Sequence, residues 1–216
     1  VLSLYAGAFF LREGITPRYT FRALLGCDEE VGMTDVKHYL AGHEQPLFLF
    51  TPDAEFPVCN AEKGCFGGTF KSAKIENGII CSWSGAEATN AIPSQSECII
   101  AVPLADLSAP QANADRITLE DAGEGCTRIF AQGIGGHASL PEGTINAIAL
   151  VAGYLHEVMD VKPDLFDPAE RSYLDLLSVV HDGTAGEGLG IAAESDAFGA
   201  LTCNAGTIEV ADGHIL

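Results

Sequence analysis

The sequence predicts an α/β domain over residues 1–63, followed by an α+β domain with an antiparallel sheet and helices over residues 64–216. In the first segment, continuous apolar runs alternate with helical patterns, which is typical of parallel strands covered on both faces. In the second segment, short strand-like runs are joined by turns and followed by two helical runs. Glycines cluster at residues 64–68 and place the domain boundary there.

The first segment is expected to alternate helix and strand. Leu2 to Arg12 is a short apolar helix, and Thr20 to Leu25 is a strand that enters an acidic turn. Thr34 and Asp35 are suited to cap a following helix, and the apolar run from Leu47 to Phe50 is a second strand. Parallel pairing of the two strands makes this segment part of an open α/β sheet.

The second segment is expected to hold an antiparallel sheet. Asn77-Gly78 is a strong hairpin signal between two of its strands. One helix is predicted from about Glu142 to Met159, and another begins at Asp167-Pro168, where Asp caps and Pro takes the first helical position. The predicted strands are Thr69 to Ile75, Gly78 to Trp83, Cys98 to Leu104, Arg116 to Glu120 and Cys126 to Gly133.

The charge balance excludes several classes of function. The chain of 216 residues has 11 Lys and Arg against 30 Asp and Glu, a net charge of −19. Binding to nucleic acid or to an anionic membrane depends on Lys and Arg, so both are disfavoured. No apolar window is long enough for a transmembrane helix. Seven cysteines without a C-x-x-C pair indicate reduced, mostly buried thiols, and hence a cytoplasmic protein.

Two carboxylate-bearing loops follow the two predicted parallel strands. Residues 26–33 (GCDEEVGM) follow the first strand, and residues 51–57 (TPDAEFP) follow the second. Parallel strands would bring both loops to the sheet edge where ligands bind. Carboxylates held close together repel one another unless a cation neutralises them, so the pattern indicates a metal site. The alternative for Asp28 to Glu30 is that these side chains cap the helix that begins near Thr34 and Asp35.

Asp53 and His137 are further candidates. Asp53 lies among Pro52, Ala54 and Phe56, where an unpaired carboxylate would be costly if buried. His137 follows a glycine-rich turn at residues 133–136, whose small residues would let a substrate approach closely. The alternative for His137 is an ordinary histidine of a surface loop.

Three blocks of the sequence together resemble a known family. They are Gly26 to Met33, Phe50 to Pro57, and His137-Ala138-Ser139 with Pro141 and Asn146-Ala147. In order and spacing they are similar to the peptidase V and carnosinase (Xaa-His dipeptidase) branch of the di-zinc dipeptidases. The resemblance runs over essentially the whole chain. It implies a metallopeptidase whose α/β catalytic domain binds two metal ions, zinc with manganese or cobalt as alternatives, and whose inserted α+β lid closes over the substrate.

The resemblance also implies a role for each candidate residue. Glu29 would be the general base that takes a proton from a metal-bound water. Glu30 would ligate one ion and Asp53 the other. His137, carried on the lid over residues 64–216, would hydrogen-bond the developing oxyanion, and Asn90 would face the substrate. A small peptide is then the expected partner.

The chain departs from the family pattern at both ends. The family's first metal-binding His and bridging Asp would fall before residue 1, and its last metal-binding His and a substrate-binding Arg after residue 216. We therefore expect a truncated portion with an incomplete metal site, inactive alone, since a catalytic zinc normally has three protein ligands. Two alternatives stay open: an N-acyl amino acid deacylase or amidohydrolase of the same fold, and a non-catalytic binding or assembly module.

Overall fold

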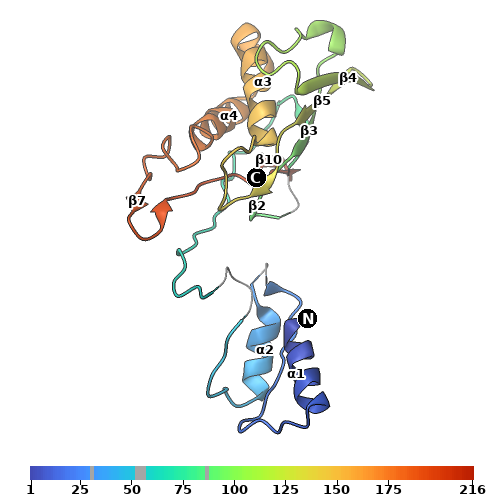
Figure 1. Ribbon diagram of the computed structural model, residues 1–216. Coiled ribbons are helices and arrows are strands. Elements are labelled where there is room, and N and C mark those ends of the chain that lie inside the picture. Colours follow the sequence, from blue (N-terminus) through green and yellow to red (C-terminus); the bar gives the residue numbers. More distant parts are fainter. Residues whose placement is uncertain (30–31, 52–56, 86–87) are drawn as a thin grey trace. The chain divides into compact units, whose positions relative to one another are not determined.

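The chain divides into two compact units, Val1–Glu62 and Lys63–Leu216. The computed structural model describes residues 1–29, 32–51, 57–85 and 88–216 (Figure 1). No helix in these ranges has the length and apolar character needed to cross a membrane. The two units are described separately.

The smaller unit contains two helices, α1 (Leu2–Arg12) and α2 (Thr34–Gly42). Both helices were predicted from the sequence. The ring centroids of Phe10 and Phe21 lie 6.4 Å apart, and the side chain of Arg22 donates to the Tyr39 hydroxyl. These contacts connect the helices to the irregular segment between them.

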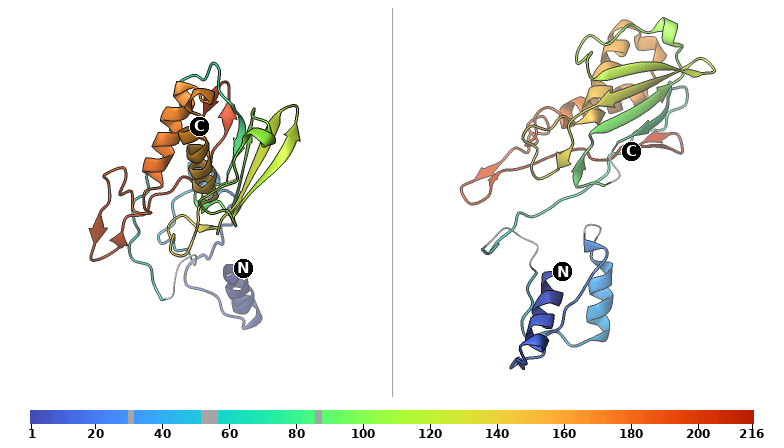
Figure 2. Two further views of the ribbon diagram at one scale, coloured as in Figure 1. Left: turned by 90° about the horizontal axis from the view of Figure 1, so that it is seen from above. Right: turned by 45° about the vertical axis from the view of Figure 1, so that its right-hand side comes forward.

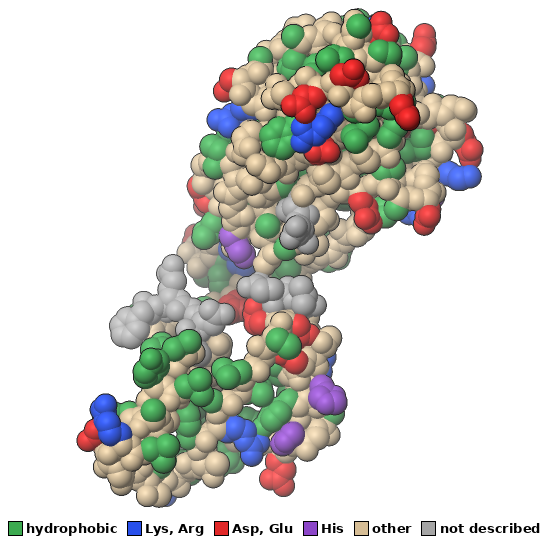
Figure 3. All heavy atoms as spheres, turned by 90° about the vertical axis from the view of Figure 1, so that its right-hand side faces the viewer, with side chains coloured by type: hydrophobic (Ala, Val, Ile, Leu, Met, Phe, Trp, Pro, Cys, Tyr) green, Lys and Arg blue, Asp and Glu red, His purple; other side chains and the backbone are tan. Residues whose placement is uncertain are grey.

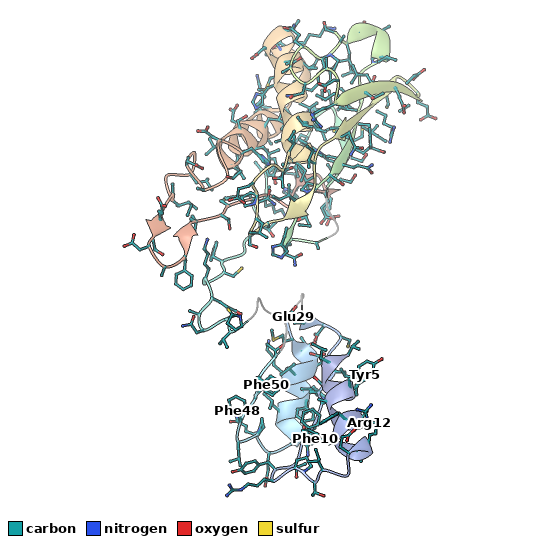
Figure 4. All side chains as sticks on the ribbon, viewed as in Figure 1. Tyr5, Phe10, Arg12, Glu29, Phe48 and Phe50 are labelled. Carbon is teal, nitrogen blue, oxygen red and sulfur yellow. The ribbon has the colours of Figure 1, made fainter. Side chains whose placement is uncertain are left out.

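The smaller unit has no core of its own in its described part. None of residues 1–29, 32–51 and 57–62 is buried. Leu47 is 95% exposed and Phe48 is 79% exposed. Phe48 and Phe50, labelled in Figure 4, have ring centroids 5.9 Å apart and still remain exposed. Figure 3 shows hydrophobic side chains (green) open on the surface of this unit.

The predicted parallel sheet is not present in the described residues. Thr20 to Leu25 and Leu47 to Phe50 belong to no strand. A strand needs neighbours that pair its backbone groups and cover its side chains, and two isolated strands give at most a marginal sheet. The mixed helix and sheet class is confirmed, but the sheets described here are antiparallel.

The larger unit is built on an antiparallel sheet, as predicted. The sheet has four strands in the order β1-β3-β5-β4. Along β5, Thr127, Ile129 and Ala131 are fully buried, while the residues between them are partly exposed. On the open face, Arg128 contacts Glu97 at 2.6 Å and Glu120 at 2.7 Å, from the two neighbouring strands. The strands are β1 (Ile80–Ser84), β3 (Gln95–Ile100), β4 (Ile117–Gly123) and β5 (Cys126–Gln132).

Two helices, α3 (Ala147–Val161) and α4 (Pro168–Val180), cover one face of this sheet (Figure 2). Helix α3 supplies Ile148, Val151 and Leu155, all completely buried, to the core. The helix begins five residues later than predicted from Glu142, because Asn146 caps it and the preceding residues bridge to Ile134.

Helix α4 begins where the sequence predicted. Asp167 accepts a hydrogen bond from the Ala169 amide, Pro168 follows it, and Glu170 completes a capping box. Glu170 is completely buried, and its second oxygen accepts a hydrogen bond from the Ile80 amide at 2.7 Å. The buried carboxylate therefore joins the start of α4 to the start of β1.

The chain bends at Glu76 and Asn77, but the hairpin predicted around Asn77-Gly78 is wrong. Residues 69–75 form no strand; instead the Ser72 amide donates to the carbonyl of Ile215 at 2.9 Å. Strand β1 pairs with β3. The physical reason is that Asp167 accepts hydrogen bonds from the Glu76 and Asn77 amides, which fixes the turn on α4.

Short elements complete the larger unit. The pair β2 and β6 carries predicted site residues and is described below. The others are β7 (Glu194–Ser195), β8 (Gly199–Ala200), β9 (Val210–Ala211), β10 (His214–Ile215) and the 3-10 turns Leu104–Asp106 and Pro163–Leu165.

All seven cysteines are free, as expected, but the prediction that most are buried is wrong. Only Cys98, on β3, is buried. Cys27, Cys59 and Cys65 are exposed because they lie in irregular segments outside the core. Burial raises the pKa of the Cys98 thiol well above its ordinary value, which keeps that thiol protonated.

The close packing around Gly133 gives a testable prediction. A Cβ atom at Gly133 would stand 2.1 Å from the carbonyl oxygen of Ile145, so Gly133→Ala forces two backbone segments apart. We expect a loss of about 2 kcal/mol or more in the free energy of unfolding. Gly153, in α3, has nothing within 4 Å of a Cβ position, so Gly153→Ala should stabilise by about 1 kcal/mol. Urea denaturation checks both, and an unaffected Gly133→Ala variant contradicts the packing described.

Candidate functional site

A two-stranded ribbon brings together two predicted site residues of the larger unit. Strand β2 (Ala91–Ile92) pairs with β6 (Gly136–His137), with Ala91 opposite His137. The pairing continues one residue further, because the Ala138 amide donates to the carbonyl oxygen of Asn90 at 2.8 Å. Asn90 and His137 are therefore held side by side along the backbone, although they lie far apart in the sequence.

The glycines before His137 allow backbone segments to pack closely. A Cβ at Gly135 would lie 3.1 Å from the Ile92 carbonyl oxygen, and one at Gly136 would lie 2.8 Å from the Thr144 methyl group. The Gly133 amide also donates to the Ser94 carbonyl at 2.8 Å. The sequence suggested that these small residues make room for a substrate. In the structure these small residues instead allow β6 to pack closely against neighbouring segments of the same chain.

Hydrogen bonds of Asn146 connect the ribbon to the start of α3. Its side-chain oxygen accepts from the Ile148 amide at 2.9 Å and so caps the helix. Its Nδ2 donates to Asn204 Oδ1 and to the Ala205 carbonyl, both at 2.8 Å. Asn204 in turn donates to the Ala91 carbonyl of β2 at 3.4 Å. Sequence reasoning missed Asn204, because a single Asn in a turn-like stretch gives no local sign of a contact with residues so distant in the chain.

His137 is exposed and so accessible to a ligand. Its Nδ1 lies 2.6 Å from the Ser139 hydroxyl and 3.2 Å from the Ser139 amide nitrogen. Nε2 lies on the other side of the ring, away from these two contacts. The ribbon can therefore present one imidazole group to a ligand, and hydrogen bonds and close packing fix the backbone that carries it.

The acidic loop of the smaller unit is organised around Asp28. The Asp28 carboxylate accepts from the Thr34 amide at 2.8 Å, from the Thr34 hydroxyl, and from the Asp35 amide at 3.3 Å. Asp35 accepts from the Cys27 amide at 2.6 Å. The helix-cap interpretation therefore holds for Asp28. The cap is supplied by Asp28 rather than by Thr34 and Asp35, which form the first turn of α2.

Glu29 follows this capping residue and is exposed in the smaller unit (Figure 4). Glu30 and Asp53 lie outside the described residues. Within the described ranges, no three His, Cys, Asp or Glu side chains form a group that could hold a metal ion. The carboxylate oxygens of Glu30 and Asp53 are donors that Zn²⁺ and Mn²⁺ accept, so the residue types fit such an ion.

The sequence is similar to two curated dipeptidases. It is 27% identical over 204 residues to "Putative dipeptidase YtjP" of Bacillus subtilis (strain 168), covering 89% of this chain and 43% of that protein. It is 27% identical over 212 residues to the "Beta-Ala-Xaa dipeptidase" of Lactobacillus delbrueckii subsp. lactis, covering 93% and 43%. No family model matches the chain. The resemblance to dipeptidases is confirmed, and the chain spans less than half the length of these relatives.

The Asp28 cap predicts a titration at very low pH. Its side-chain hydrogen bonds with Asp35 and then with Thr34 lower the pKa of Asp28 to about 2. Because this value is below the ordinary 3.8, the cap stabilises the folded loop above about pH 3.8 and is lost as the pH falls through 2. Carboxyl ¹³C NMR should give a midpoint near 2, raised in Thr34→Val and retained in Thr34→Ser. A midpoint near 3.8 in the unmodified chain contradicts the cap.

The role of Asn146 can be separated into its two parts. Asn146→Ala removes the helix cap and the bonds to residues 204 and 205, so we expect a loss of about 2 kcal/mol of stability. Asn204→Ala leaves the cap in place and should cost about 1 kcal/mol. Chemical denaturation followed by circular dichroism measures both. Equal losses in the two variants would mean that the cap contributes nothing.

Proposed function

We propose that the whole protein hydrolyses dipeptides. The similarity to two proteins named as dipeptidases, across about nine tenths of this chain, carries the proposal. The ribbon that carries His137 supports it, because an exposed imidazole on a paired backbone can donate to a peptide carbonyl. Residues 64–216 would then act as the lid, and residues 1–63 as part of the catalytic domain.

In this proposal Glu29 is the general base. Its side chain is exposed, and it directly follows Asp28, whose carboxylate accepts from the Thr34 amide at the start of α2. It would take the proton from the attacking water and return it to the leaving amine. His137 would donate from Nε2 to the carbonyl oxygen as negative charge develops there. One such donor contributes roughly 3 kcal/mol of transition-state stabilisation.

Glu30 and Asp53 would each hold one divalent metal ion, zinc or, as alternatives, manganese or cobalt. A bound ion of this kind supplies an activated water and polarises the scissile carbonyl. Two carboxylates give fewer than the three protein ligands of a usual catalytic zinc, so we expect residues 1–216 alone to be inactive. We also propose a cytoplasmic location, because seven free thiols suit a reducing compartment.

The substrate class follows from one panel measured with the full-length protein. We expect hydrolysis of dipeptides, with β-Ala-Xaa and Xaa-His dipeptides as the first to be tested. N-acetyl amino acids are the matched alternatives. Preferential cleavage of the N-acetyl compounds would assign the protein to the deacylases of the same fold. Tight binding of peptides without turnover would favour a binding module and overturn the hydrolase proposal.

Substitution of the base is the sharpest test of the assigned roles. In the full-length protein, Glu29→Gln should lower kcat by about 100-fold or more, since the amide cannot accept the proton. Glu13→Gln, at another exposed carboxylate of the same unit, is the control and should leave kcat unchanged. Chelation should abolish turnover, and Zn²⁺ or Mn²⁺ should restore it. Normal turnover by Glu29→Gln removes Glu29 from the mechanism.

A further inference from the structure

The turn after β6 determines which nitrogen of His137 carries the proton. The Ser139 amide points its N–H at Nδ1 of His137, with 3.2 Å between the nitrogens. A backbone amide can only donate, so Nδ1 must accept with its lone pair. In a neutral imidazole one ring nitrogen accepts and the other carries hydrogen. The proton of His137 is therefore on Nε2.

Ser139 reinforces this arrangement through its side chain. Its hydroxyl oxygen lies 2.6 Å from the same Nδ1 and can donate to it as well. Two donors from one residue thus converge on one ring nitrogen. The amide contact is set by the backbone of the turn, because the Leu140 amide donates to the His137 carbonyl at 2.9 Å and the Ala138 amide donates to Asn90.

Other histidines of the chain have the opposite environment. Nδ1 of His43 lies 3.0 Å from the Tyr39 carbonyl oxygen. Nδ1 of His181 lies 2.8 Å from the Leu177 carbonyl, and that of His214 lies 3.0 Å from the Ser72 carbonyl. A carbonyl can only accept, so in these three residues the neutral ring carries its proton on Nδ1. His137 thus differs from them in the group that faces Nδ1.

We propose that Ser139 is a positioning residue that holds His137 as the Nε2–H tautomer, so that its one N–H donor faces away from the turn toward a substrate carbonyl. The tautomer follows from the contacts of the turn, and its use in catalysis rests on the proposed function. The opposite tautomer would present a lone pair to the carbonyl oxygen and would repel the developing negative charge. Selecting the tautomer before substrate binds removes that unproductive form.

The tautomer can be measured without any assay of activity. Long-range ¹H–¹⁵N NMR of the ¹⁵N-labelled 216-residue chain, in alkaline buffer where free imidazole is neutral, distinguishes protonated from unprotonated ring nitrogens. We expect Nδ1 of His137 to be unprotonated and Nε2 protonated, with the reverse for His43, His181 and His214. A protonated Nδ1 at His137 overturns the proposal, whatever the full-length protein hydrolyses.

The contribution of the hydroxyl needs matched variants of the full-length protein. Ser139→Ala leaves only the amide donor, so the Nδ1–H form of His137 should become detectable and kcat should fall about fivefold with little change in KM. Ser139→Thr keeps a hydroxyl, so its His137 tautomer and its kcat should match those of the unmodified protein. Ser178→Ala, which removes the hydroxyl 2.8 Å from Nε2 of His156, is the control and should change neither. A Ser139→Ala variant with an unaltered tautomer and kcat overturns the role of the hydroxyl.

These experiments separate the positioning of His137 from the proposed hydrolysis. If the full-length protein cleaves no dipeptide but His137 carries its proton on Nε2, the dipeptidase proposal fails and the control of the tautomer by Ser139 stands. If dipeptides are cleaved but Nδ1 carries the proton, the function stands and the role of Ser139 fails.

Discussion

The close approach of two backbone segments at Gly133 is the constraint on which the rest of the larger unit depends. Gly133 follows directly after β5, and a Cβ atom there would lie 2.1 Å from the Ile145 carbonyl oxygen, so no side chain fits. The Ile134 amide donates to the Ile145 carbonyl, and the Ile145 amide donates to the Ile134 carbonyl, both at 2.9 Å. This contact decides where the chain leaves the sheet, and hence where β6 presents His137.

Hydrogen bonds from the start of helix α3 also fix the position of the ribbon. The Ala147 amide at its start donates to the Pro93 carbonyl just after β2, and Asn146 reaches to residues 204 and 205. Both strands of the ribbon are thus tied to one helix whose inner face is buried in the core. The imidazole of the candidate site is exposed, but the backbone that carries it is fixed by a well-packed unit.

The candidate residues of the two units differ in how well the surrounding structure supports them. The larger unit buries a continuous core between its sheet and its helices, as Figure 2 illustrates. In the smaller unit, Glu29 is placed by a loop that Asp28 and Asp35 fold onto α2, with no buried residue among those described. Acidic side chains are also spread over the surface of the larger unit (red in Figure 3), in keeping with the net charge of −19.

Signals carried by neighbouring residues located the helices, whereas the partners of individual strands and turns were predicted less well. The Asp167-Pro168 start of α4 depends on neighbouring residues and was predicted correctly. The hairpin at Asn77-Gly78 failed because Asp167, far away in the chain, binds the turn. Asn90 was named only from the resemblance to a family, whereas His137 was named first from its glycine-rich turn and then from the resemblance. The pairing that joins them, and the part played by Asn204, depend on contacts between distant segments that no local pattern reveals.

The central claim is that the His137 part of the site is preformed by its backbone. Amide hydrogen exchange of the 216-residue chain tests it most directly, at the amides of Ile134, Ala138 and Ala147. If the claim is right, these amides exchange as slowly as those between β3 and β5, because their hydrogen bonds open only when the larger unit unfolds. Exchange at the rate of an unstructured peptide at these three positions would contradict it.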